Sequence, residues 1–163
     1  MSENILSSDT FFTKGIVELI GEDFINESYV IVDLDCIRFS GDELISSKNK
    51  KVIGFASSNF SCYLAEKMKV DFILNKKSTL KDIIDFFIFG KTKALYYSQS
   101  PLTVREKQLL ALVCTGASPL DLAKTLGVNK KTIYTFRRNI MIKLGCNNRL
   151  NLQQLWNEKT LGF

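Results

Sequence analysis

Histidine is absent from this chain of 163 residues, and tryptophan and proline are scarce, with one and two copies. Without histidine, neither a Ser-His-Asp nor a Cys-His nucleophile can form, which weighs against many hydrolases. The four cysteines include no Cys-x-x-Cys pair, so we interpret them as reduced core residues rather than zinc ligands. We therefore expect a protein that is not an enzyme and needs neither a metal nor a cofactor.

Long hydrophobic runs are also missing. The longest largely apolar run, IIDFFIF at 83–89, is about a third of the roughly 20 residues that a bilayer span needs. The opening MSENILSSDT has neither the basic start nor the small-residue cleavage site of a secretory signal. Hydrophobic residues make up 45% of the chain, enough for a packed core. We expect a cytoplasmic protein that does not interact with membranes.

The charges are distributed unevenly along the chain. Residues 1–100 carry 12 Lys and Arg against 14 Asp and Glu, a net charge of −2. Residues 101–163 carry 10 against 3, a net charge of +7. A basic terminal module attached to a nearly neutral body predicts a polyanionic partner at that end.

A polar stretch before Pro101 divides the chain. Proline disfavours helix in the residue before it, so we predict a linker at 91–100 between an α/β domain (1–90) and an all-α domain (101–163). In the first domain, short apolar runs alternate with helical patterns, which indicates parallel strands with crossover helices. The expected strands are 3–8, 28–35, 50–58 and 71–76, and the expected helices are 10–22, 62–69 and 79–90.

The basic domain is predicted to contain four helices, at 102–116, 118–127, 129–145 and 148–159. The second and third are short helices joined by a tight turn, LGVN, which is a helix-turn-helix pattern. The third, NKKTIYTFRRNIMIKLG, has five Lys and Arg and no acidic residue. Its apolar residues fall on one stripe, so we expect the cations to stay out of the core. That stripe consists of Ile133, Phe136, Ile140 and Leu144.

Residues 102–149 resemble the C-terminal DNA-binding domain of LuxR/FixJ/NarL-type transcription regulators. The matching motifs are LTxRE at the start, LAxxLGV (122–128), the Lys131-Thr132 pair and NIMxKLG (139–145). The resemblance implies a four-helix module that binds inverted half-sites as a dimer through its last helix. It also implies base contacts by Tyr134, Thr135 and Arg138. The phosphate contacts that it implies are Lys130, Lys131, Thr132, Arg137, Lys143 and Arg149.

The first hundred residues resemble a shortened receiver domain. Asp33, at the end of YVIVD, matches the phosphoacceptor aspartate, and Lys76 matches the active-site lysine. The acidic pair that holds Mg²⁺ in receivers is replaced by Ser7 and Ser8, with Asp9 one position late. Because Mg²⁺ needs carboxylates to help neutralise a phosphoryl group, a lone Asp33 gives little support for phosphorylation.

Two interpretations of Asp33 therefore remain. It is either phosphorylated, driving dimerisation, or it is a vestigial strand-end carboxylate paired with Lys76, which we favour. The domain is then a dimerisation or partner-docking platform, as in auxiliary regulators of the RcsA and BglJ type, which it resembles. The nearly all-apolar run at 83–89 is a candidate for the protein interface.

The sequence thus predicts a bacterial sequence-specific transcription activator located at the nucleoid. Its expected partners are promoter DNA, a second copy or a related regulator, and RNA polymerase. One alternative is a response regulator activated by phosphorylation of Asp33. Another is an adaptor whose helical module binds protein instead of DNA.

Overall fold

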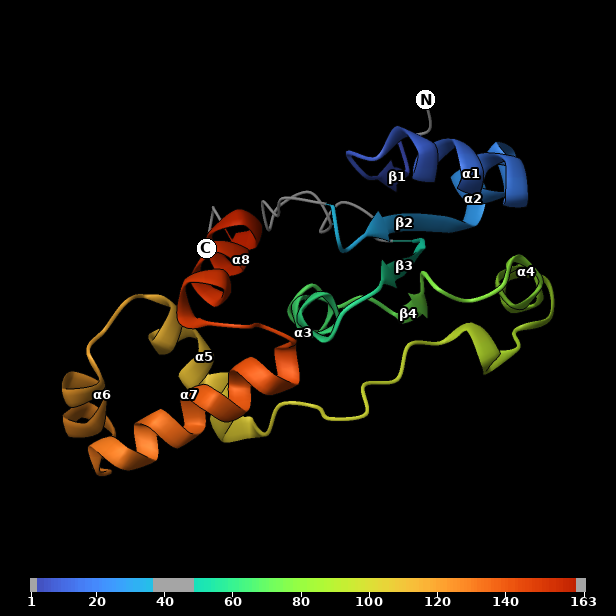
Figure 1. The fold of residues 1–163 in the computed structure, drawn as a ribbon. Coiled ribbons are helices and arrows are strands. Elements are labelled where there is room, and N and C mark those ends of the chain that lie inside the picture. Colours follow the sequence, from blue (N-terminus) through green and yellow to red (C-terminus); the bar gives the residue numbers. More distant parts are fainter. Residues whose placement is uncertain (1–2, 37–48, 161–163) are drawn as a thin grey trace. The chain divides into compact units, whose positions relative to one another are not determined.

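The structure, a computed structural model, describes residues 3–36 and 49–160. The chain divides into two compact units between Ser98 and Gln99. The first unit combines a parallel sheet with helices, and the second is entirely helical where it is described (Figure 1). The predicted fold class, α/β followed by all-α, is therefore confirmed. Residues 37–44, which follow the strand of Asp33, lie outside the described residues.

Four parallel strands form the sheet of the first unit, in the order β1-β2-β3-β4. Their bounds are β1 Ile5–Leu6, β2 Tyr29–Asp33, β3 Lys51–Ala56 and β4 Phe72–Asn75. Asp33 is paired in register with Phe55, and Ala56 with Asn75. The carboxyl ends of the strands therefore meet at one edge of the sheet, where the receiver-like residues gather.

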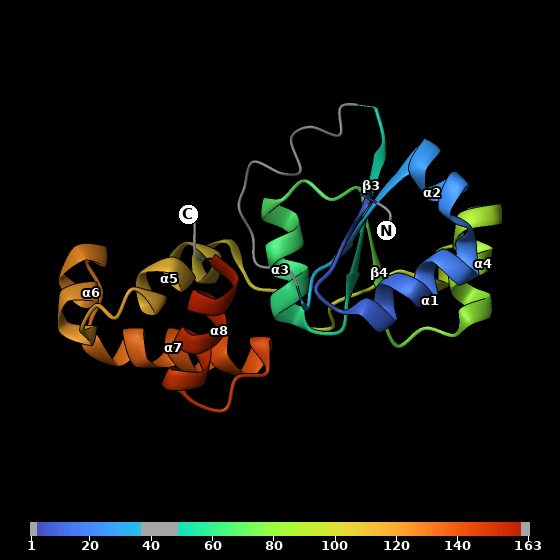
Figure 2. The ribbon, with the colours of Figure 1, turned by 90° about the horizontal axis from the view of Figure 1, so that it is seen from above.

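Helices cover both faces of this sheet (Figure 2). They are α1 Thr10–Ile20, α2 Glu22–Ser28, α3 Asn59–Lys67 and α4 Leu80–Phe89. Helix α3 lies on one face, and α1, α2 and α4 lie on the other. On that second face, Ile31, Ile53 and Phe55 form a core with Ile16 and Ile83.

Helix α2 was not predicted as a separate element. Gly21, with a φ of 95°, ends α1 and starts a new helix, a conformation that glycine adopts without steric cost. The new helix is polar apart from Phe24 and Ile25, and Ile25 is fully buried. Tertiary packing of Ile25 thus accounts for a helix that the sequence pattern does not reveal.

Part of the predicted linker, 91–100, folds with the first unit. A 3₁₀ turn, η2 Thr92–Ala94, places Ala94 fully inside the first unit. The Tyr96 amide donates to the Ile73 carbonyl (2.8 Å), and the Tyr96 hydroxyl donates to Asn59 (2.8 Å). Residues 92–96 are therefore part of the first unit, because their apolar side chains have a sheet edge to pack against.

The second unit contains α5 Val104–Cys114, α6 Pro119–Leu126, α7 Lys130–Leu144 and α8 Arg149–Thr160. The predicted capping box at the start of α5 is formed in full by Thr103 and Glu106. The fully or almost fully buried side chains of this unit are Leu109, Leu110, Val113, Leu122, Ile133, Ile140 and Leu152. Among the described helices, none combines the length and apolar character needed to cross a membrane.

Candidate nucleic-acid interface

The turn between α6 and α7 fixes the start of the basic helix. Gly127 takes a left-handed conformation (φ 63°), and its amide bonds back to the last turn of α6. Asn129 then caps α7, since its side chain accepts the Thr132 amide at 2.8 Å. The Thr132 hydroxyl donates to the same Asn129 oxygen at 2.9 Å. These contacts form a helix-turn-helix unit with α7 as its second helix.

Five of the nine side chains predicted to bind DNA lie exposed on α7. They are Lys130, Lys131, Tyr134, Thr135 and Arg138. Tyr134 keeps 49% of its surface exposed, with the Lys130 Nζ atom 6.0 Å from its ring centre. Thr132 is partly buried by its role in the cap. Since α7 contains no acidic residue, these five side chains present only positive, aromatic and hydroxyl groups.

Arg137 departs from the prediction that the cations stay out of the core. It is only 7% exposed and lies on the buried stripe with Ile133, Ile140 and Leu144. Its Nε and Nη2 atoms are buried and have no hydrogen-bond partner. Burial, followed by the nearby Arg149 charge, lowers the pKa of Arg137. The apolar periodicity had predicted Phe136 rather than Arg137 on the buried stripe, but Phe136 is only partly buried.

Lys143, which was predicted to contact a phosphate, forms an ion pair within the helical unit. Its Nζ atom lies 2.7 Å from the Glu106 carboxylate and donates to the Pro101 carbonyl at 3.2 Å. Burial alone would raise the pKa of Glu106, but the hydrogen bonds from Lys143 and Thr103 lower it overall. The pair therefore ties the last turn of α7 to the start of α5. Arg149, at the start of α8, donates to the Gly116 carbonyl at 3.3 Å.

At the carboxyl edge of the first unit's sheet, Asp33 is fully buried and paired with Lys76. The Lys76 Nζ atom lies 2.7 Å from one Asp33 oxygen, and the Ser7 hydroxyl donates to the other at 2.9 Å. Burial alone would lower the pKa of Lys76, but the hydrogen bond and charge of Asp33 raise it overall. The carboxylate thus already holds one cation and one hydroxyl.

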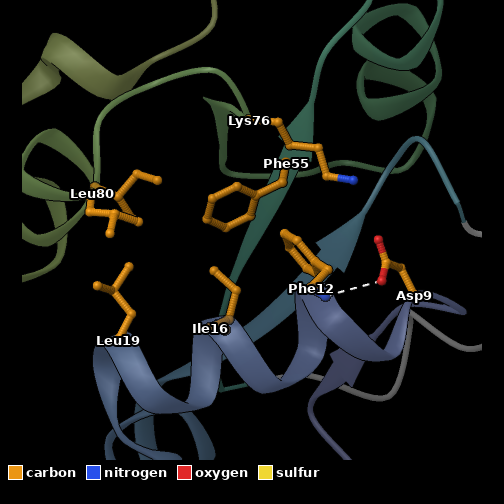
Figure 3. Close-up of a pocket in the computed structure, with 9 residues that line it drawn as sticks. Asp9, Phe12, Ile16, Leu19, Phe55, Lys76 and Leu80 are labelled. Atoms are coloured by element: carbon orange, nitrogen blue, oxygen red, sulfur yellow. Dashed lines mark hydrogen bonds between the residues drawn. The ribbon is translucent and has the colours of Figure 1, made fainter.

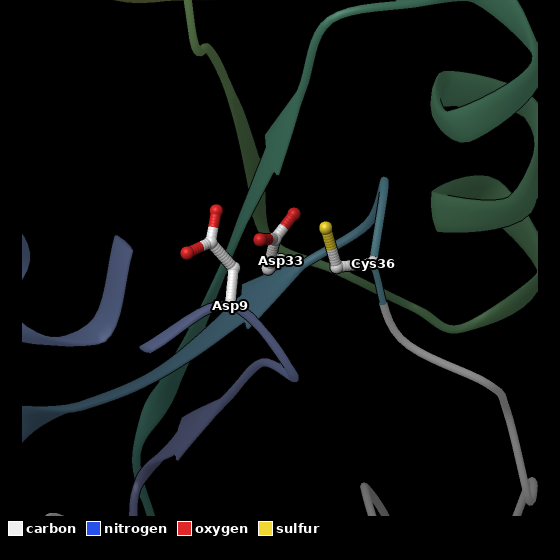
Figure 4. Close-up of side chains that lie close together, drawn as sticks. All are labelled: Asp9, Asp33 and Cys36. Carbon is white, nitrogen blue, oxygen red and sulfur yellow. The ribbon is translucent and has the colours of Figure 1, made fainter. Parts of the chain in front are cut away.

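The donor atoms around Asp33 do not fit Mg²⁺, the ion that receiver domains use. Oxygen and sulfur atoms of Asp9, Asp33 and Cys36 lie within 4.8 Å of one another (Figure 4). Sulfur is a soft ligand, whereas Mg²⁺ prefers an octahedron of oxygens. One Asp9 oxygen also accepts the Phe11 and Phe12 amides and so caps α1. Within this cluster of described residues only two carboxylates remain, and both already hold other groups.

An apolar groove of about 340 Å³ runs between α1 and α4 (Figure 3). Its lining includes Phe12, Ile16, Leu19, Phe55, Leu80 and Ile83. A second hollow of about 250 Å³ is lined by Leu19, Ile20, Phe24, Ile84, Phe87 and Ile88. Leu80, Ile88 and Phe89, all on α4, are 64–67% exposed. Of the run at 83–89 for which exposed apolar surface was predicted, Ile88 and Phe89 are exposed, whereas Phe87 is buried.

Comparison with known proteins places the helical unit in a family. Residues 100–155 match the model of the bacterial regulatory proteins, luxR family. The transcriptional regulatory protein MctR of Rhizobium johnstonii is 32% identical over 88 residues, which cover 51% of this chain and 41% of that protein. UhpA of Escherichia coli, also a transcriptional regulatory protein, is 39% identical over 54 residues, covering 33% and 28%.

The chain thus spans less than half the length of these curated relatives. A solved structure of two RcsB dimers bound to two parallel DNAs resembles this chain with a TM-score of 0.59 and 16% identity, covering 96% of this chain and 97% of that one. Identity at that level indicates a shared fold, which is a receiver-like domain followed by a helix-turn-helix domain. The helical unit of this chain is therefore a LuxR-type helix-turn-helix domain, a member of the luxR family of bacterial regulatory proteins.

Proposed function

We propose that this chain is a bacterial transcription regulator that binds promoter DNA as a dimer and is not controlled by phosphorylation of Asp33. The observation that carries the proposal is the exposed face of α7, where Lys130, Lys131 and Arg138 surround Tyr134 and Thr135 without an acidic side chain. Such a face fits the major groove, where hydrogen-bond donors read base edges and cations neutralise phosphates.

The roles within this face follow from position and chemistry. Arg138, two turns into α7, is suited to donate two hydrogen bonds to the edge of a guanine. Lys130 and Lys131 lie in the first turn of α7, where the backbone amides also favour a phosphate. Tyr134 and Thr135 offer a ring and a hydroxyl between them. The domain would therefore combine base contacts with flanking phosphate contacts.

A DNA selection tests this function. The full chain would be incubated with a random-sequence duplex pool, and the enriched site titrated against a scrambled duplex. We expect Arg138→Ala to weaken binding to the enriched site by about 1–3 kcal/mol and to relax its sequence preference. The control is Lys124→Ala, an exposed lysine on α6. If no duplex is enriched, the helical unit is better described as a protein-binding adaptor.

The dimer is proposed to form through α1 and α4 of the first unit. Leu80, Ile88 and Phe89 are exposed there beside two apolar hollows. Projections and hollows on one face allow two copies, or one copy and a related regulator, to pack symmetrically. Two bound domains would then face two half-sites. RNA polymerase is the proposed later partner of the bound dimer, which would make the protein an activator.

Control by phosphorylation is disfavoured because Asp33 is fully buried and, among the described residues, its neighbouring metal-ligand atoms come from one carboxylate, Asp9, and one thiol, Cys36. Regulation would then come from the amount of protein or from its dimer partner. Incubation with acetyl phosphate and Mg²⁺ tests this directly. Stable labelling of the wild type that disappears in Asp33→Ala would instead favour a phosphorylation-activated response regulator.

A further inference from the structure

Arg137 is the least satisfied charged group among the described residues of the helical unit. Arg137 is only 7% exposed, and two of its three side-chain nitrogen atoms are buried without a hydrogen-bond partner. No described carboxylate forms an ion pair with it. Most buried polar groups in proteins are hydrogen-bonded, so an unpaired buried guanidinium calls for a functional explanation.

The surroundings make this position less favourable still. Arg149 is close enough for its charge to lower the pKa of Arg137, and the Nε atom of Arg149 is itself buried without a partner. Two cations thus lie near each other, and no carboxylate of the described part of the chain forms an ion pair with either. The free domain would be more stable with an apolar side chain of similar length at position 137.

Arg137 also lies close to the exposed face of α7. The Arg137 guanidinium carbon is 6.0 Å from the ring centre of Tyr134, which is half-exposed on that face. Arg138, the next residue, is exposed. The long side chain of Arg137 thus starts beside the face that would meet DNA, and reaching that face requires new rotamers of Arg137 and Tyr134.

We propose that Arg137 is a stored phosphate ligand, held unpaired beneath Tyr134 in the free domain and drawn out onto a DNA backbone phosphate when the domain binds. This inference rests on the proposed DNA-binding function and goes beyond it. It assigns Arg137 two positions and links DNA binding to relief of an unfavourable burial. The ligand is a phosphodiester because α7 approaches the duplex, and a phosphate oxygen accepts the paired donors of a guanidinium.

The proposal predicts opposite effects of one substitution on stability and on binding. Arg137→Met should raise the urea midpoint of the full chain, followed by the fluorescence of Trp156, the only tryptophan, which lies in the helical unit. The same variant should bind a mixed-sequence duplex more weakly, with a log-log salt slope shallower by about 0.9 per bound subunit. Arg138→Met, the matched control, should weaken binding with no change in the urea midpoint.

Each outcome decides the matter. The proposal is refuted if Arg137→Met has a lower urea midpoint than the wild type. It is also refuted if Arg137→Met does not fold and the neutral Arg137→Gln loses stability, because the guanidinium would then have a structural role. An unchanged salt slope would mean that Arg137 never reaches a phosphate. If the wild type binds no duplex at all, the proposed function itself fails. If the wild type binds duplex DNA and the Arg137 variants show the same salt slope as the wild type, the proposed function stands and this inference alone fails.

Discussion

The ion pair between Lys143 and Glu106 allows a sharp test of how α7 is held. Lys143→Met removes the cation but keeps most of the aliphatic length of the side chain. Glu106, which is only 4% exposed in the intact structure, then keeps hydrogen bonds from Thr103 alone, including the Thr103 amide at 2.8 Å. Breaking a buried pair from one side costs about 3–5 kcal/mol. Because the Lys143 side chain is 24% exposed and water can partly replace it, we expect about 2–3 kcal/mol.

The loss of stability can be followed specifically in the helical unit of the full chain. Trp156 is the only tryptophan of the chain and lies in α8, so its fluorescence during urea unfolding reports on this unit. For a domain of this size, about 2–3 kcal/mol corresponds to a drop in melting temperature of roughly 10–20 °C. The matched control is Lys124→Met, which replaces an exposed lysine of α6 and should shift stability by less than about 0.5 kcal/mol.

Two results would contradict this reasoning. If Lys143→Met unfolds at the same urea concentration as Lys124→Met, the ion pair contributes nothing, and Lys143 is available to DNA after all. If Glu106→Gln destabilises far more than Lys143→Met, the carboxylate acts through the α5 cap rather than through Lys143. The double variant separates these cases, because two residues that act as a pair give a smaller loss together than the sum of their separate losses.

Three further predictions follow from other contacts. Because folding lowers the pKa of Glu106, its contribution to the free energy of unfolding is fully present above its unfolded pKa of about 4.3 and is lost as the pH falls through the folded pKa. The urea midpoint followed by Trp156 fluorescence should therefore decrease when the pH is lowered beneath about 4, and the decrease should be less steep in Glu106→Gln. Gly54→Ala would place a Cβ atom 2.6 Å from the Leu34 Cδ1 atom, so it should destabilise the first unit by about 1–3 kcal/mol in thermal unfolding followed by circular dichroism. Ile88→Lys should shift the dimer towards monomer in analytical ultracentrifugation, whereas Lys81→Met, an exposed change near the start of α4, should not.

Local signals made the helical unit easy to predict. Each of its first three helices begins with a side chain that accepts an amide three residues on, and α6 and α7 end at a glycine in the left-handed conformation. Such signals act within a few residues and need no tertiary context. The strands were predicted for a similar reason, since a buried parallel strand is a short run of apolar residues.

The sequence was less informative wherever packing, rather than local pattern, decides. Helix α2 forms because Ile25 is buried, and residues 92–96 join the first unit because Ala94 packs against it. The burial of Arg137 and the ion pair of Lys143 were missed for a related reason. Periodicity reports which residues are apolar, not which cation lies beneath an aromatic ring or reaches a buried carboxylate. No signal in a single sequence would have found either contact.

These two departures change the electrostatics expected of the DNA complex. The sequence places five cations on α7, but the structure exposes only Lys130, Lys131 and Arg138. If each of these three neutralises one phosphate, a dimer makes six contacts through α7, and its affinity should fall about 2 × 10³-fold between 50 and 200 mM salt. If Arg137 is also drawn out, the contacts become eight and the fall is about 2 × 10⁴-fold. A tenfold difference across one salt series is easily measured. Comparing the salt dependence of affinity of the wild type with that of Arg137→Met therefore shows whether three cations of α7 contact DNA or whether Arg137 becomes the fourth.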